Sequence, residues 1–274
     1  MWISCLLINV GDNTDRPPGR LWLRNLYHVH QRLCMAFPSA SRKSNDPLFL
    51  HPFKPDEFAD GHVRVRRGEN SGFLYRIDSL PGGCVVILVQ SAAKPNWEYA
   101  FQNARFLLAA PPHVKPFDAH FTAGQQLAFR IRVNLSKKLK RAANGADLQK
   151  KGESMDRWGR PKAQSKRVAL TWEKGQNPEG VIRKWFAAKA GDSFDLETLR
   201  VIQIGWGTGY QPKREAESQG RLKFRSALLE GTLAVKNEET FREIIVCGIG
   251  SAKAFGFGLL SVAPVCTDDD DRRS

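Results

Sequence analysis

The chain has 274 residues, 42% of them hydrophobic, and its 42 lysines and arginines outnumber its 28 aspartates and glutamates to give a formal charge of +14. That length and apolar content suit two compact domains. The five scattered cysteines include no CxxC pair, so they indicate neither a disulfide framework nor a zinc site, and a reducing cytoplasm fits best. The basic excess indicates a polyanionic partner; nucleic acid leads over an anionic membrane or solubility alone, because basic stretches alternate with aromatic and glycine-rich ones.

The first half of the chain predicts three strands and one helix. The opening stretch, 2–10, is apolar over one strand length and lacks a basic leader and a cleavage site, so it is a strand and neither a signal peptide nor a membrane span. A helix is expected at 26–38, followed by strands at 72–79 and 84–91 that a Pro-Gly-Gly turn joins. The segment 94–126 has several prolines and no sustained period and is interpreted as the crossing between two domains.

The second half also alternates strands with helices. A strand opens it at 127–141, and a basic segment of low apolar content at 137–167 is interpreted as a loop or hairpin. Periodicity then predicts a helix near 180–191, paired strands at 199–210 and 220–235, a helix at 238–249, a final strand at 258–265 and a disordered tail. Two βαββαβ units in tandem are the economical architecture.

The helix at 26–38 carries an unusual tyrosine and histidine. Residues three apart lie on neighbouring faces of a helix, so Tyr27 and His30 can point toward one site beside an apolar stripe. His28 and His30 point apart, which argues against a His-x-His metal chelate. The alternative is that His30 is simply a packed or solvated residue.

Basic side chains gather on the strand that opens the second half. Its alternation places Phe129, Ile131 and Val133 on one face and two arginines on the other. The cations of this strand and of the segment after it either form a solvated face or contact phosphates, and the overall charge favours phosphates. They are Arg130, Arg132, Lys137, Lys138, Lys140 and Arg141.

A glycine-rich element, CGIGSAKAFGFGLLSVAP at 247–264, closes the second half. It does not fit a dinucleotide-binding fingerprint, because that motif opens a helix after the first strand of a βαβ unit. Glycines around one lysine let backbone amides approach a phosphate closely, and the alternative is a tight connection without a ligand. The candidate residues are Gly248, Gly250, Lys253, Gly256 and Gly258.

Four stretches carry a resemblance to a known family, in this order: MWISCLLINV, LYHVHQRLCMAFP, FRIRVNLSKK and GIGSAKAFGFGLLSVAP. Through them the chain resembles the repeat-processing endoribonucleases of type I-E CRISPR systems, the CasE group. The resemblance implies an α+β fold of two tandem ferredoxin-like (RRM-like) βαββαβ domains, placed at 1–122 and 123–265, before a disordered tail at 266–274. It also implies binding of one CRISPR repeat hairpin in the precursor of the CRISPR RNA (crRNA), cleavage at the 3′ base of its stem without a metal, and retention of the mature crRNA with the other subunits of the Cascade complex. Neither a small-molecule cofactor nor a membrane is expected.

The resemblance places the catalytic pair on Tyr27 and His30 and a basic hairpin near the base of the RNA stem on Lys213 and Arg214. Some members carry a lysine five residues after the histidine, where this chain has Met35. Because RNA carries its own 2′-hydroxyl nucleophile, such an enzyme needs positioning and proton transfer, for which histidine is suited. Arg24 or a glycine-loop amide then becomes the candidate for stabilising the developing charge.

A noncatalytic RNA-hairpin-binding scaffold of the same fold is the alternative, in which His30 has lost its task. The missing lysine at Met35 is the feature that favours it. The isolated histidines show no partner pattern and are interpreted as structural or exposed; they are His51, His62, His113 and His120.

Overall fold

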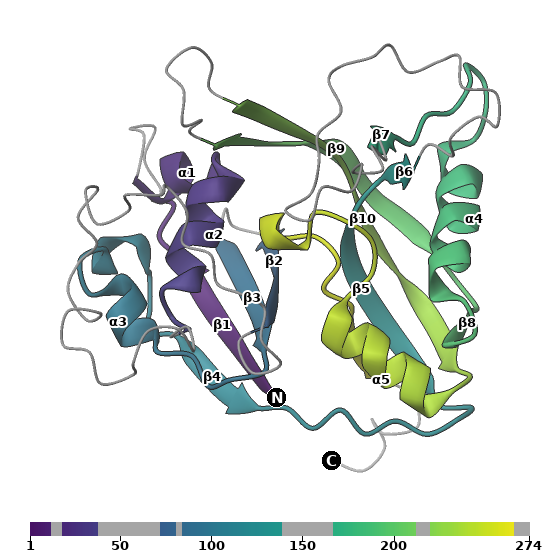
Figure 1. The fold of residues 1–274 in the computed structure, drawn as a ribbon, viewed down its shortest axis with the longest axis horizontal. Helices are drawn as coiled ribbons and strands as arrows, with labels where there is room; N and C mark the ends of the chain where they lie inside the picture. Colours follow the sequence, from purple (N-terminus) through teal and green to yellow (C-terminus); the bar gives the residue numbers. More distant parts are fainter. Residues whose placement is uncertain (12–17, 38–71, 81–83, 139–166, 212–219, 266–274) are drawn as a thin grey trace, which may run out of the picture.

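The computed structural model describes residues 1–11, 18–37, 72–80, 84–138, 167–211 and 220–265. Figure 1 shows two sheets beside each other, with the hairpin of β9 and β10 extending from the second unit toward α1 and α2. The predicted tandem ferredoxin-like fold is confirmed, because each unit orders its strands as that fold requires. The boundary after residue 122 stays a prediction, and the tail at 266–274 lies outside the described residues.

The first unit is an antiparallel sheet in the order β2-β3-β1-β4, with its helices on one face. Alternation in β1 buries Ser4, Leu6 and Ile8, and the last two join a core that includes Val29 and Leu33 from α2. The elements of this unit are β1 (Trp2–Ile8), α1 (Pro18–Leu23), α2 (Leu26–Cys34), β2 (Phe73–Ser79), β3 (Val85–Ser91), α3 (Trp97–Phe101), the 3₁₀ turn η4 (Arg105–Leu107) and β4 (His113–Pro116).

The second unit is built on the order β11-β5-β10, with β8 and β9 both paired to the long strand β10. The apolar face of β5 is buried as its alternation predicts and packs with Phe186 of α4 and Phe241 of α5. Its elements are β5 (Gln126–Asn134), β6 (Ser136–Lys138), β7 (Arg167–Ala169), α4 (Pro178–Ala190), β8 (Phe194–Leu196), β9 (Arg200–Gln211), β10 (Gly220–Val235), α5 (Glu238–Cys247), the 3₁₀ turn η5 (Lys253–Phe255) and β11 (Ser261–Pro264).

Three details differ from the sequence-based expectations. The segment 94–126 is more than a crossing between domains: it holds α3 and β4, and β4 pairs with β1 to complete the first sheet. The strand expected at 127–141 ends at Asn134, after which β6 leaves the sheet and pairs with β7. The helix α1 precedes the expected helix, which itself ends at Cys34.

The sheet face opposite α2 meets the second unit through buried polar contacts. Arg76 donates from Nε to Asp78 at 2.8 Å and from Nη1 to the carbonyl oxygen of Arg130 and to Ser261 Oγ, both at 2.8 Å. Gln90 donates to the carbonyl oxygen of Ile245 at 2.6 Å. The bonds to Arg130, Ser261 and Ile245 connect β2 and β3 of the first unit with β5, β11 and α5 of the second, so they fix the position of one unit on the other.

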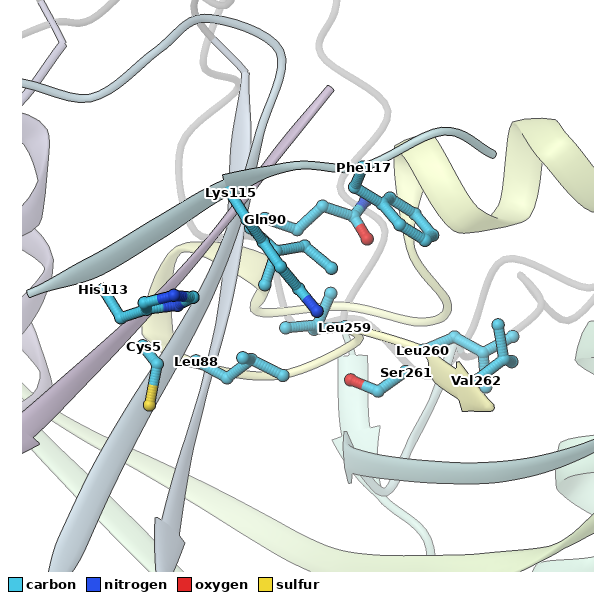
Figure 2. A pocket seen from close by; sticks show the side chains of 11 residues that line it. Cys5, Leu88, Gln90, His113, Lys115, Phe117, Leu259, Leu260, Ser261 and Val262 are labelled. Carbon is cyan, nitrogen blue, oxygen red and sulfur yellow. The ribbon is translucent and has the colours of Figure 1, made fainter. Parts of the chain in front are cut away.

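A cavity of about 340 Å³ lies at the same junction, on the side of the first sheet away from α2. Figure 2 shows His113 and Lys115 of β4 on one side and Leu259, Leu260 and Val262 on the other. The cavity walls include neither Tyr27 nor His30. This hollow is therefore separate from the tyrosine–histidine helix.

We expect Arg76→Met to lower the free energy of unfolding by about 3–5 kcal/mol, because it removes the nearer of the two arginines beside the buried Asp78 carboxylate and leaves only Arg130, at 3.8 Å. Denaturant titration measures the loss. Arg105→Met is the matched control, since the ion pair of Arg105 with Glu98 is largely exposed and should contribute little. Equal losses in the two variants would show that the buried ion pair of Arg76 and Asp78 contributes no more to stability than an exposed one.

Candidate active site

Helix α2 presents Tyr27, His30 and Cys34 on one face, since residues i, i+3 and i+7 lie on the same side of a helix. The helix begins at Leu26 because Asn25 caps it: the Asn25 side chain accepts a hydrogen bond from the Tyr27 amide at 3.1 Å. Tyr27 is 8% exposed and His30 is half-buried. Tyr27 and His30 therefore lie on the same face of α2, as predicted, and the Cys34 thiol lies beside them.

Aromatic rings and the thiol hold the His30 imidazole. It stacks on Phe73 of β2 with ring centroids 5.7 Å apart and lies 6.3 Å from the ring of Phe255 in η5. The Cys34 sulfur lies 3.5 Å from Nε2 and 3.9 Å from Nδ1, within reach of a hydrogen bond whose direction depends on the tautomer of the ring. The imidazole is thus oriented from both units.

The Tyr27 phenol remains protonated at neutral pH. Burial raises its pKa above the usual 10.0, and the nearby Cys34 raises it further. A neutral phenol donates a hydrogen bond but is a poor proton acceptor. Proton abstraction at this site would therefore fall to His30.

The glycine-rich loop reaches α2 around the edge strand β2. The buried Tyr75 hydroxyl donates to the carbonyl oxygen of Ala254 at 3.2 Å and lies 3.5 Å from that of Leu26, so one side chain connects the loop with the helix. Gly256 has φ +81°, and a Cβ there would stand 3.0 Å from the Tyr75 ring. Glycine is favoured here because residues with a side chain rarely adopt this backbone conformation and a Cβ would crowd the Tyr75 ring.

Strand β9 closes the other side of α2. A Cβ on Gly207 would stand 3.2 Å from Leu26 Cδ1, so the missing side chain allows the strand to lie against the start of the helix. Gly209 faces the Tyr27 amide in the same way. The site thus lies where α2, η5 and β9 meet, and Figure 1 shows η5 between the two units beside α2.

The glycine loop is partly explained by packing. The Gly248 amide donates to the Ile244 carbonyl oxygen and the Gly258 amide to that of Arg132, each at 2.7 Å. Gly250 has more room, because its nearest neighbour would be Trp185 at 3.8 Å. Phosphate binding by the loop stays a prediction, which now rests on Gly250 and on Lys253 in η5 rather than on the two engaged amides.

The arginines predicted on β5 lie at the junction of the sheets, away from α2. Arg130 Nε is 3.2 Å from Glu230 and 3.8 Å from Asp78. Burial lowers the pKa of the Arg132 guanidinium. A role for these two arginines in phosphate binding stays a prediction, while their observed contacts are within the protein.

The other predicted cations are dispersed. Arg24 is exposed in the turn before α2, and Lys137 is exposed on β6. Lys138 belongs to β6, but its side chain is not described. Four of the predicted cations lie outside the described residues: Lys140, Arg141, Lys213 and Arg214.

Sequence reasoning missed Cys34, Tyr75 and Phe255 as neighbours of the candidate pair. Cys34 had a local signal, because it follows His30 by four residues on the same helix. Tyr75 and Phe255 had none, since only the tertiary fold brings β2 and η5 to α2.

No helix in the described part of the chain is long and apolar enough to cross a bilayer. Among the same residues, no three His, Cys, Asp or Glu side chains form a group that could hold a metal ion.

Two tandem units with the ferredoxin-like strand order, and a histidine-bearing helix where they meet, place the chain in the class of double ferredoxin-like (RRM-like) folds. Within it, the chain belongs to the CRISPR associated protein family, whose model matches residues 1–264.

Two curated relatives are each 26% identical to this chain. The CRISPR-associated endoribonuclease Cse3 of Thermus thermophilus aligns over 266 residues, 96% of this chain and all of that protein. The CRISPR system Cascade subunit CasE of Escherichia coli aligns over 247 residues, 90% of this chain and 96% of that protein. A solved structure of Cse3 bound to a 19-nucleotide RNA superposes with a TM-score of 0.62 at 26% identity, covering 96% of this chain and 100% of that one.

Proposed function

We propose that this protein is a metal-independent endoribonuclease that binds the CRISPR repeat hairpin in precursor crRNA. It cleaves at the 3′ base of the stem, leaves a 2′,3′-cyclic phosphate and a 5′-hydroxyl, and stays bound to the mature crRNA as a Cascade subunit. The observation that carries the proposal is the nearly full-length similarity to an endoribonuclease, together with the placement of Tyr27 and His30 at one junction. We place the reaction in the cytoplasm, whose reducing conditions keep cysteines such as Cys84 and Cys247 as thiols.

In the proposed mechanism, the 2′-hydroxyl oxygen attacks the adjacent phosphorus while the bond from phosphorus to the 5′ oxygen breaks. His30 moves the proton, as base toward the attacking hydroxyl or as acid toward the leaving oxygen. Tyr27, a neutral phenol, orients the 2′-hydroxyl or donates to a phosphate oxygen. No covalent intermediate with the protein is required, because the nucleophile belongs to the RNA.

We assign Lys253 as a candidate for stabilising the phosphorane charge. Its turn, η5, packs against α2, and Phe255 of the same turn lies against the ring of His30. A cation near the reacting phosphate stabilises the charge that develops in the transition state. Arg24, exposed just before α2, is the other candidate.

Met35→Lys tests whether cleavage is slowed by the absence of the lysine that some members of the family carry at this position. Met35 is half-buried and packs against the core of the first unit, so lysine should lower stability by about 1–3 kcal/mol without accelerating cleavage. Melting temperature and single-turnover rate are measured together. A faster reaction would instead show that the site lacks a positive charge.

Cys34→Ala should slow single-turnover cleavage by a few-fold, equivalent to the loss of one hydrogen bond of about 1 kcal/mol, because the thiol no longer orients the imidazole. Hairpin affinity should hardly change. Cys5→Ala is the matched control, since Cys5 lines the cavity on the other side of the sheet. Equal rates for Cys34→Ala and the wild type would leave the thiol as packing only.

A noncatalytic hairpin-binding scaffold is the second candidate. It is favoured by the low exposure of Tyr27, 8%, and by the packing of His30 between two aromatic rings. Incubation of excess protein with the repeat hairpin of its own host, followed by gel analysis and size exclusion, separates the two. We expect cleavage with the product retained on the protein, whereas retention of intact RNA would favour the scaffold.

A further inference from the structure

The second sheet carries an exposed aromatic and cationic cluster that the cleavage site does not use. Trp206 of β9 is 55% exposed, although large apolar side chains are normally covered. The Lys223 ammonium lies 4.5 Å from the centre of its ring. Arg225 stacks on Trp172 at 3.6 Å and lies 5.8 Å from the Trp206 ring. We call Trp172, Trp206, Lys223 and Arg225 the tryptophan cluster.

The fold holds this cluster rigidly. Arg225 pairs directly with Trp206 across β9 and β10, so the two side chains share one face of the sheet. Arg225 Nη1 also donates to the Leu170 carbonyl oxygen at 2.7 Å, which ties the cluster to the segment after β7. The arginine is therefore pre-positioned between two tryptophans, and the second cation, Lys223, is exposed.

Only the width of β9 separates the cluster from the candidate active site. Successive residues of a strand point to opposite faces, so Trp206 lies on one face and its neighbour Gly207 on the other, against Leu26 at the start of α2. In the described part of the chain β9 pairs only with β10, so no strand is paired to its other edge. A single strand of RNA that leaves the candidate active site at α2 can cross that edge and reach Trp206.

We propose that the tryptophan cluster binds single-stranded RNA adjoining the base of the hairpin, with one base stacked on Trp206 and its phosphate near Lys223. The inference rests on the proposed function and extends it to RNA outside the stem. Unpaired bases stack on exposed aromatic rings, and lysine and arginine beside those rings neutralise the backbone. A duplex keeps its bases stacked internally, so the stem itself does not suit this surface.

The test compares the affinities of a bare hairpin and of hairpins with a short single-stranded flank on the 5′ or the 3′ side. Each RNA carries a 2′-deoxynucleotide at the scissile position to prevent cleavage, and binding is followed by fluorescence anisotropy. In the wild type one flank should tighten binding by about tenfold, the lower range for one base–aromatic stack. The arm that gains affinity identifies the side that the cluster binds.

Trp206→Ala should reduce the ratio of flanked to bare affinity to about one, and Trp206→Phe should keep most of it, because phenylalanine also stacks. Lys223→Gln should make the salt dependence of flanked binding shallower by about 0.7 in log–log slope, as expected for one phosphate contact to a single strand. Ile202→Ala, at a 48% exposed position of the same strand, is the control and should leave the ratio unchanged.

A ratio that Trp206→Ala does not alter overturns the inference. The proposed function can fail separately: if the wild type does not bind the bare hairpin, that proposal is wrong. The flank alone, as a free oligonucleotide, still tests the cluster in that case. Trp206→Ala must then weaken oligonucleotide binding, and equal affinities refute the assignment.

Discussion

Replacing His30 with alanine should lower the single-turnover rate of hairpin cleavage by about 10²- to 10⁴-fold, the usual contribution of a general acid–base group. Hairpin affinity should hardly change, because the imidazole acts mainly in the transition state. In addition, the His30 ring packs against the rings of Phe73 and Phe255 and is only partly exposed. Rapid-quench cleavage with excess protein and equilibrium binding of uncleavable RNA measure the two effects separately.

His28→Ala is the matched control for this variant. His28 belongs to the same helix but is exposed and points away from His30, so its loss should leave the rate unchanged. Undiminished cleavage by His30→Ala would remove His30 from the mechanism. Loss of binding together with cleavage would instead indicate a packing role.

A single 2′-deoxynucleotide immediately 5′ of the scissile phosphate should block the reaction completely, since it removes the attacking oxygen. The RNA should still bind, because one hydroxyl contributes little to the recognition of a whole A-form stem. Deoxy substitution one nucleotide further along the strand is the control and should permit cleavage. Cleavage of the deoxy substrate at the original bond would show that water, rather than the RNA, supplies the nucleophile.

The local elements of the fold could be predicted from sequence because their patterns are local. Alternation in β5 placed Ile131 and Val133 in the core, and the structure buries both. The apolar stripe of α2 predicted its packing in the same way, through Val29 and Leu33. Strand β4 was missed because it is a four-residue edge strand among prolines, and only its pairing with β1 makes it regular.

The site was only half predictable. Tyr27 and His30 share a helix, so their proximity follows from a spacing of three residues. The partners of His30 come from β2 and η5, far away in sequence, and no local pattern announces them. The same limit applies to Arg130: alternation gives its side of the strand, but only tertiary structure shows that Glu230 and Asp78 lie there.

The chemistry of the product ends shows most directly whether the 2′-hydroxyl cleaves the RNA without a metal. Purified protein is incubated with its host's repeat hairpin in EDTA, and the fragments are analysed for their termini. A 2′,3′-cyclic phosphate on the upstream fragment and a 5′-hydroxyl on the downstream fragment, at the 3′ base of the stem, are expected. A metal-dependent reaction would instead show no cleavage in EDTA and recovery with magnesium, and a 5′-phosphate on the downstream fragment would likewise contradict attack by the 2′-hydroxyl.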